Sequence, residues 1–368
     1  MRSALRQPRF WLGMAVSVVA LLYAVRGVSW PELATALRQA DYRWLAPGLV
    51  VVVAGQVART VRWRALFGDG PRPRLVPAFE ILCVGYMVSA VFPLRLGDPL
   101  RAWLIQTRTR ADGATALATI MAERAIDFLM IAVLVALLVP AHASLMLTER
   151  LGPGPWSEPA NLAVIAMGLA ALVYAGMLVA AAAGPRLARA VASGLESGGA
   201  PPGLARRVGA ATARFAGGFG PLRRGRTLGL VTAWTLAVWL LGAASNWVFL
   251  RAFVPDGTFG AALLVLGVTG LFAVLPSSPG YAGVFHSAVV IALAALGDVP
   301  RPTALAYAIV LHGVTILALI ALGIGAVWTL GLRGSDLGRT LDAQATAGGP
   351  GSHDDGGRAA LRSSGRRR

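Results

Sequence analysis

Residues 114–139 read ATALATIMAERAIDFLMIAVLVALLV, an apolar run whose only charged residues are Glu123, Arg124 and Asp127. The run exceeds the about 20 residues that an α-helix needs to cross the hydrocarbon core of a bilayer. At 1.5 Å per residue, Glu123 would lie roughly 13 Å along that helix, near the middle of a core of about 30 Å. A charged side chain there costs about 2.5–3.5 kcal/mol on insertion scales, so it must pair, face a bundle interior or reach water. The stretch predicts a membrane helix with a buried polar centre.

The composition of the whole chain fits a membrane protein. Its 368 residues are 56% hydrophobic and only 14% charged, whereas about 25% charged residues are usual in soluble domains. The mean hydropathy of +0.64 excludes an ordinary soluble enzyme. The formal net charge of +17 would suggest nucleic acid as a partner of a soluble protein. Here the arginines lie in short loops and at helix ends, where basic residues set the orientation of a membrane protein. We therefore expect no nucleic-acid partner.

The apolar runs predict an all-α fold, a polytopic helical membrane protein with about eight membrane segments in one domain, residues 1–332. A shorter amphipathic helix over residues 27–43 is expected to lie in the outer interface, with Pro31 in its first turn. The tail, residues 333–368, has almost no large apolar side chains and is expected to be a disordered cytoplasmic segment. The predicted spans include Phe10–Val25, Trp44–Ala58, Ala114–Val139, Leu162–Ala183, Leu228–Leu250 and Ala304–Leu330.

The distribution of arginine sets the expected orientation. Residues 59–74 and residues 184–227 are rich in arginine and poor in carboxylates, whereas residues 140–158 hold a single arginine. Because basic loops stay in the cytoplasm, the first two segments are predicted inside and the third outside. The amino and carboxyl termini would then both be cytoplasmic, in a bacterial or archaeal cytoplasmic membrane.

Two regions must enter the membrane and return to the same side, residues 75–113 and residues 258–297. In each, an apolar arm stops at a proline, in AVFP (90–93) and in AVLP (273–276). Asp98 and Ser278 are good helix N-caps, each followed by a proline, so each hairpin is predicted to break one helix and start another inside the membrane. Matched broken segments in two halves point to a transporter binding site. The alternative is two pairs of full spans joined by tight turns.

Charged and polar side chains near these breaks form the candidate binding site. We predict that Arg95, Arg101 and Arg124 face a cavity and bind an anionic headgroup, because the planar guanidinium donates paired hydrogen bonds to phosphate. Asp98, Glu123 and Asp127 would orient these arginines, and a helix start near Ser278 or Gly280 would add backbone donors. A purely structural ion network is the alternative.

Other candidates are less specific. Arg59, Arg62 and Trp63 are predicted to anchor a helix at the lipid interface and to meet lipid phosphates there. His286 follows the second break and is a candidate for substrate binding or proton transfer, whereas His312 fits a bundle interior. No nucleotide-binding, hydrolase or metalloprotease motif occurs, so we expect neither an enzyme nor a metal or organic cofactor.

Four motifs together resemble the flippase-like transmembrane domain of lysylphosphatidylglycerol synthases. They are RTVRW (59–63), FPLRLGDPLR (92–101), ERAID (123–127) and PSSPGYAGVF (276–285). The resemblance covers roughly residues 10–332 and implies a bacterial or archaeal multi-spanning protein with re-entrant helices. In full-length synthases this domain is implied to move aminoacylated phospholipid between leaflets, while a soluble domain, expected to be missing here, transfers the amino acid. Asp98 and His286 stand where relatives often have Glu.

These observations lead us to expect a non-enzymatic translocator of an anionic, phosphate-bearing lipid, either a modified phospholipid or a polyprenyl-phosphate-linked lipid. One alternative is an integral-membrane enzyme or enzyme subunit that acts on lipids or lipid-linked glycans through Asp98, Glu123 or His286. Another is a scaffold for a separate lipid-modifying enzyme. The expected partners are anionic membrane lipids and, under the last alternative, that enzyme.

Overall fold

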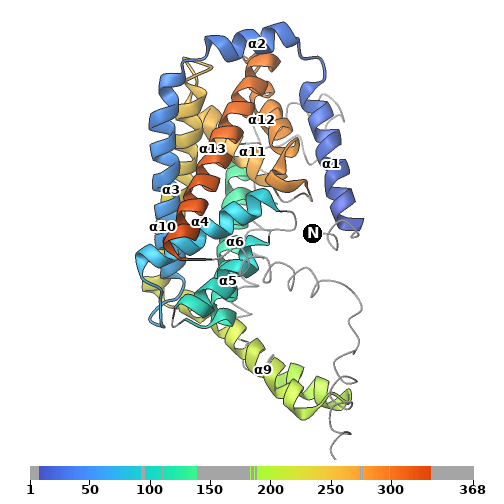
Figure 1. Ribbon diagram of the computed structural model, residues 1–368, viewed down its shortest axis with the longest axis vertical. Coiled ribbons are helices and arrows are strands. Elements are labelled where there is room, and N and C mark those ends of the chain that lie inside the picture. The colour runs from blue at the N-terminus through green and yellow to red at the C-terminus, as the bar shows by residue number, and fades with distance from the viewer. Residues whose placement is uncertain are drawn as a thin grey trace, which may run out of the picture.

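The computed structural model describes residues 8–92, 96–109, 111–138, 189–273, 277–297 and 299–332, with residues 183, 186 and 275. Every regular element in these ranges is a helix, which confirms the all-α prediction. The helices form an elongated bundle, with α2 (Trp30–Gln39) across one end and α9 (Pro202–Gly217) at the other (Figure 1). The tail, residues 333–368, and most of the predicted span Leu162–Ala183 lie outside the described residues.

The first two helices are joined at a sharp bend. α1 (Pro8–Val25) and α2 meet at 84°, so α2 lies across the end of the bundle instead of continuing the span (Figure 1). Pro31 stands in the first turn of α2, Leu33 is buried, and Trp30 is 65% exposed. The amphipathic helix expected over residues 27–43 is therefore present in a shorter form.

Long apolar helices form much of the rest of the bundle. Three of the described helices are long and apolar enough to cross a membrane: the helix Tyr42–Ala65, α10 (Gly225–Leu250) and α13 (Arg301–Thr329). The first of these contains α3 (Leu45–Ala65). The bent pair α1–α2 would make a fourth span. α6 (Gly113–Leu138) is 26 residues long but carries three charged residues at its centre. These helices confirm a polytopic membrane protein.

Both predicted hairpins consist of short helices. α4 (Leu75–Val91) and α5 (Gly97–Arg108) form the first, and α11 (Phe259–Phe272) and α12 (Val284–Ala294) form the second. At 1.5 Å per residue, arms of 17, 12, 14 and 11 residues reach roughly 26, 18, 21 and 17 Å, less than a core of about 30 Å. The arms are therefore too short for full perpendicular spans.

The tips of the two hairpins touch. A 3-10 turn, η5 (Pro279–Tyr281), joins the arms of the second hairpin, and Gly280 within it has a positive φ of 68°. A Cβ atom on Gly280 would lie 3.2 Å from the carbonyl oxygen of Ala90, near the end of α4. The two breaks in the sequence thus meet inside one bundle.

The capping predicted at these breaks is wrong. α5 begins at Gly97 after Leu96 without a side-chain cap, and Asp98 lies within its first turn. The carboxylate of Asp98 instead pairs with Arg124, a charged and therefore stronger partner. Ser278 precedes only η5 and makes no capping bond there, while α12 follows Gly283 at a positive φ of 83°.

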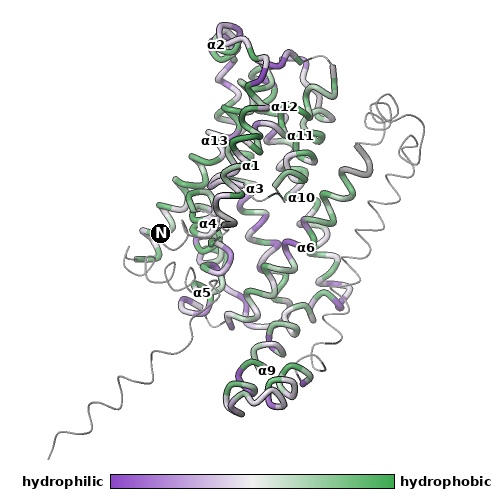
Figure 2. The backbone as a smooth tube through the Cα atoms, turned by 90° about the vertical axis from the view of Figure 1, so that its right-hand side faces the viewer, coloured by the Kyte–Doolittle hydropathy of each residue, from purple (hydrophilic) through white to green (hydrophobic). Residues whose placement is uncertain are grey.

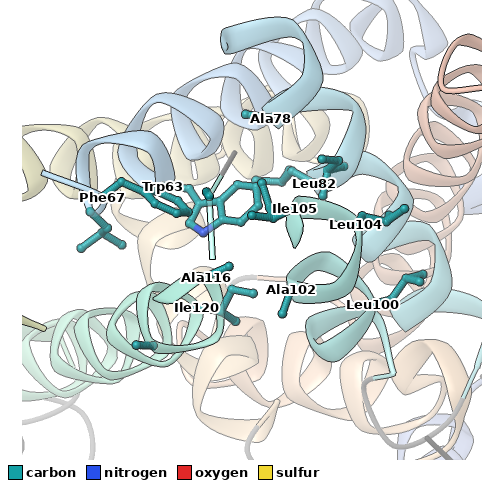
Figure 3. Packing of buried hydrophobic residues seen from close by; sticks show 14 of the residues in the cluster. Trp63, Phe67, Ala78, Leu82, Leu100, Ala102, Leu104, Ile105, Ala116 and Ile120 are labelled. Carbon is teal, nitrogen blue, oxygen red and sulfur yellow. The ribbon is translucent and has the colours of Figure 1, made fainter. Parts of the chain in front are cut away.

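Hydrophobic side chains fill the space between α3, α4, α5 and α6. Trp63 is fully buried and lies among Leu82, Ile105 and Ile120, which come from three different helices (Figure 3). Its indole N–H donates to the Thr119 hydroxyl at 3.0 Å. The close approach of α4 and α5 depends on two glycines, because a Cβ on Gly97 would overlap the carbonyl oxygen of Gly85 and the hydroxyl of Ser89.

Contacts at the α9 end bring the predicted inner loops together. Asp69, after α3, pairs with Arg224, before α10, and Asp112, before α6, lies 3.6 Å from Arg214 of α9. Most described arginines outside the bundle centre lie in or near these segments, so the basic loops occupy the same end, as expected. Which membrane face this end occupies stays a prediction.

We expect Gly97→Ala to lower the free energy of unfolding by about 1–3 kcal/mol, because overpacking against backbone cannot be relieved by a rotamer change. Thermal unfolding of the detergent-solubilised protein measures the change. Gly229→Ala is the matched control, because a Cβ there has no neighbour within 4 Å; it should be neutral or stabilising by about 0.5–1 kcal/mol. Equal melting temperatures for Gly97→Ala and the wild type would contradict the close helix contact.

Candidate functional site: a buried arginine–carboxylate network

Arg62 of α3 reaches across the bundle to two carboxylates of α6. Its Nη1 and Nη2 donate to Asp127 Oδ1 and Oδ2 at 2.6 and 3.0 Å, a bidentate pair. Nη2 also lies 3.4 Å from Glu123 Oε1. Glu123 and Asp127 are one helical turn apart and face the same way, so one guanidinium serves both.

Two further arginines complete the network. Arg101 of α5 donates from Nη2 to Glu123 Oε2 at 3.1 Å and lies 3.7 Å from Asp98. Its guanidinium centre is 4.2 Å from the ring centroid of Trp63, within the range of a cation–π interaction. Arg124 of α6 donates to both oxygens of Asp98, at 2.8 and 3.2 Å.

Neutral donors add further hydrogen bonds to two of these carboxylates. The Tyr86 hydroxyl of α4 donates to Glu123 Oε1 at 3.2 Å, and the Trp239 indole of α10 donates to Asp127 Oδ1 at 3.2 Å. The network therefore joins α3, α4, α5, α6 and α10. Figure 2 shows hydrophilic positions interrupting the apolar helices near the middle of the bundle. The charges of its three arginines and three carboxylates cancel; the members are Arg62, Asp98, Arg101, Glu123, Arg124 and Asp127.

Burial divides the network into a fixed part and an accessible edge. The side chains of Arg62 and Glu123 are 0% exposed, and that of Arg101 is 1% exposed. By contrast, Arg124 is 24% exposed and its partner Asp98 is 11% exposed, while Asp127, the partner of Arg62, is 16% exposed. Nε and Nη1 of Arg101 are buried without a hydrogen-bond partner among the described atoms. Arg124–Asp98 is therefore the ion pair of the network in which both the arginine and the carboxylate are accessible.

Five of the predicted site residues meet here, and their shortest ion pairs run between helices. Asp98, Arg101, Glu123, Arg124 and Asp127 form one cluster, as the sequence predicts. Arg124 pairs with Asp98 of the neighbouring helix, and not with Asp127 on its own helix. Arg101 and Arg124 are both paired with carboxylates in this state, which is closer to the alternative of an ion network.

The interface prediction is wrong for Arg62 and Trp63. Both side chains are fully buried, Arg62 in ion pairs and Trp63 in the apolar core. Arginines beside a tryptophan at a helix end are typical of an interface, but here the partner of Arg62 lies 65 residues away in the sequence. Arg59 is half-buried, with its guanidinium 6.0 Å from the Tyr86 ring centroid, and its lipid contact stays a prediction. Arg95 lies outside the described residues.

The sequence pattern did not predict that Arg62 belongs to the network, or that Tyr86 and Trp239 donate hydrogen bonds to its carboxylates. One signal was available for Arg62. Two carboxylates on one helical face need a nearby cation at the membrane midplane, and Arg124 directly follows Glu123 and cannot face both. A further arginine from another helix was therefore implied, although nothing in the sequence says which.

The second hairpin forms a separate polar cluster. The backbone N–H of Ser278 donates to the Ser17 hydroxyl of α1 at 2.7 Å, and Nε2 of His312 lies 2.8 Å from the Gly280 carbonyl oxygen. The rings of His286 and His312 are 5.0 Å apart, and the Gly283 N–H donates to His286 Nδ1 at 3.3 Å. In the described part of the chain, these residues make no hydrogen bond with the arginine–carboxylate network.

Residues 10–323 match the family described as lysylphosphatidylglycerol synthase TM region. The chain belongs to this family. It is 25% identical over 339 residues to glycosyltransferase AglD of Haloferax volcanii. The aligned region covers 86% of this chain and 54% of that protein. It is 30% identical over 130 residues to a UPF0104 membrane protein of Methanothermobacter thermautotrophicus, covering 33% of this chain and 38% of that one.

The chain therefore spans about half the length, or less, of these curated relatives. No solved structure matches it.

Removing Arg62 should destabilise the protein strongly. Arg62→Ala leaves Asp127 and Glu123 short of a buried cation, and breaking a buried ion pair on one side costs about 3–5 kcal/mol. Arg74→Ala is a matched control, because Arg74 is exposed. Thermal unfolding in detergent should show a large fall in melting temperature for Arg62→Ala and almost none for Arg74→Ala. Similar melting temperatures for the two variants would refute the fixed role of Arg62.

Proposed function

We propose that this protein moves a phosphate-bearing anionic lipid between the two leaflets without changing it chemically. The lipid is either a modified phospholipid or a polyprenyl-phosphate-linked lipid. The observation that carries the proposal is the Arg124–Asp98 pair at the accessible edge of a charged network inside a membrane bundle. Membership of the lysylphosphatidylglycerol synthase TM family supports a role in lipid handling.

The charged headgroup of such a lipid has to cross the hydrocarbon core. A charged headgroup meets the same barrier in the hydrocarbon core as a charged side chain, so its passage requires compensating polar groups at that depth. Matched broken helices around such groups are a known design of transporter binding sites. Here two hairpins of short helices touch at Ala90 and Gly280, and α5 and α6 supply the Arg124–Asp98 pair.

We infer that phosphate binds by exchanging partners with a carboxylate. Arg124 presents both Nε and Nη2 to Asp98, a fork that fits two phosphate oxygens equally well. Phosphate would replace Asp98 on Arg124, while Arg101 remains 3.7 Å from Asp98 and can take up its charge. The arginine thus stays paired at each stage. Arg62 and Glu123 serve as the fixed frame, and Ser278, Gly280 and His286 belong to the opposing hairpin.

We further infer that the basic α9 end faces the cytoplasm, because arginine-rich short loops are retained there. The amino terminus precedes α1, which runs toward α2, and α13 runs back toward the α9 end (Figure 1). The start of α1 and the end of α13 would then both lie toward the cytoplasm.

Translocation can be measured in liposomes that contain a headgroup-labelled phosphatidylglycerol, by following how fast an external quencher reaches inner-leaflet label. Wild type should accelerate exposure of the label. Arg124→Gln should slow this by about tenfold, the equivalent of losing one charge-assisted pair. Arg108→Gln is the control, since Arg108 is an exposed arginine of α5 outside the network.

The proposal fails if Arg124→Gln, shown to be folded by its melting temperature, moves lipid as fast as the wild type. It also fails if no anionic lipid is moved by the wild type.

Asp98→Asn should have the opposite effect on equilibrium binding. Removing the carboxylate takes away the competitor for Arg124, so anionic lipid should bind several-fold more tightly than to the wild type. Native mass spectrometry with phosphatidylglycerol and phosphatidylcholine measures this ratio. Weaker binding to Asp98→Asn would show that the two ligands do not share Arg124.

A second candidate comes from the named relative. The similarity to a glycosyltransferase extends over 86% of this chain, so this protein is also a candidate membrane component in lipid-linked glycan modification, either as an enzyme subunit or beside a separate enzyme. Lipid mass distinguishes the two functions. A changed mass after incubation with lipid-linked sugar favours modification, whereas an unchanged lipid in the opposite leaflet favours translocation.

A further inference from the structure

A hollow of about 450 Å³ lies at the basic end of the bundle, and none of the six network residues lines it. It is formed by the end of α3, the segment that follows it, and the start of α10. Its volume falls in the range of small-ligand sites, about 300–1,000 Å³. Its lining combines three arginines with a threonine and two large apolar side chains, namely Arg64, Arg72, Arg226, Thr227, Leu230 and Trp234.

The charge of the hollow is positive. Arg64 is held in place by a hydrogen bond from Nε to the Pro73 carbonyl oxygen, at 2.9 Å. Asp69 is the acidic residue of the lining, and it pairs with Arg224, which does not line the hollow. Within the described ranges, no carboxylate lies at ion-pair distance from Arg72 or Arg226, and both residues are exposed. An anion therefore meets arginines whose charge is not compensated locally.

The start of α10 adds to this preference. Arg226 and Thr227 belong to its first turn, and the residue that precedes the helix makes no side-chain cap. The N–H groups of a first turn have no partner within the helix and carry a partial positive charge. Such a terminus, beside arginine side chains, is suited to a phosphate group.

The lining changes from charged to apolar along a single face of α10. Arg226, Leu230 and Trp234 follow one another at intervals of four residues, so they form one stripe that runs from the end of the bundle toward its middle. Leu230 is 47% exposed, so its side chain is open to a ligand. A ligand seated here would place an anionic group at the arginines and an apolar chain along Leu230 and Trp234.

We propose that this hollow binds the phosphate headgroup of an anionic membrane lipid, with its acyl chains along the Leu230–Trp234 stripe. A free phosphate compound would use the same arginines but would gain nothing from the apolar stripe. The inference goes beyond the proposed function, because it concerns binding at equilibrium at one end of the bundle and holds whether or not lipid crosses the membrane.

The test is lipid binding to the purified full chain, measured by native mass spectrometry during titration with phosphatidylglycerol and, in parallel, phosphatidylcholine. The double variant Arg72→Gln/Arg226→Gln should bind phosphatidylglycerol about tenfold more weakly, because two charge-assisted contacts are lost. The matched control is Arg74→Gln/Arg223→Gln. It removes the same charge from two exposed arginines near the same end that do not line the hollow, and should bind phosphatidylglycerol as the wild type does.

Two further measurements identify the ligand. Leu230→Gln should weaken phosphatidylglycerol binding several-fold. The concentration of inorganic phosphate that displaces the bound lipid should stay the same. Equal loss of phosphatidylglycerol binding in both double variants would show that binding depends on the total charge of this end and not on the hollow, and would overturn the proposal. If Leu230→Gln binds as the wild type and inorganic phosphate displaces the lipid at low concentration, the ligand is a soluble phosphate compound and the lipid proposal is wrong. A failure of translocation with this binding intact would refute only the function proposed above.

Discussion

The structure depends on the compensation of charge at the centre of an apolar bundle. α6 carries Glu123, Arg124 and Asp127 where charged side chains are most costly, and it is stable there only because other helices supply partners. Arg62 comes from α3 and Arg101 from α5, so the packing of three helices is fixed by the need to pair these charges. Removing any one partner leaves a buried charge without compensation, so the packing of the bundle centre depends on the intact network.

This constraint also shapes the first hairpin. Arg101 can reach Glu123 only if α5 returns close beside α4, and the side chain of Arg101 passes directly over Gly85. The backbone contact between Gly85 and Gly97 allows this approach, since any Cβ on Gly97 would overlap α4. The apolar core around Trp63 then packs on the same helices, so aromatic packing, glycine contact and ion pairing support one geometry (Figure 3).

Among the described arginines, those of the bundle centre and those of the hollow have different surroundings. Those in the bundle centre are paired with carboxylates and set helix positions, with Arg124 at the accessible edge. Arg72 and Arg226 at the α9 end face a hollow and have no described carboxylate partner. Under the two proposals above, an anionic lipid would meet Arg72 and Arg226 first, where water still screens its charge, and Arg124 only at the depth where charge must be compensated.

The sequence alone determined the all-α membrane fold, the hairpins and most of the network. Apolar runs and their charged interruptions report directly on the cost of transfer into hydrocarbon, which is a local property of each segment. Tertiary structure decided the pairings: Arg62 joins Asp127 across 65 residues, and Asp98 pairs with Arg124 instead of capping its helix. Residues 59–63 alone resemble an interface motif, because the partner that buries Arg62 belongs to another helix. Which helix supplies that partner depends on how all the helices pack, and this is a property of the whole chain.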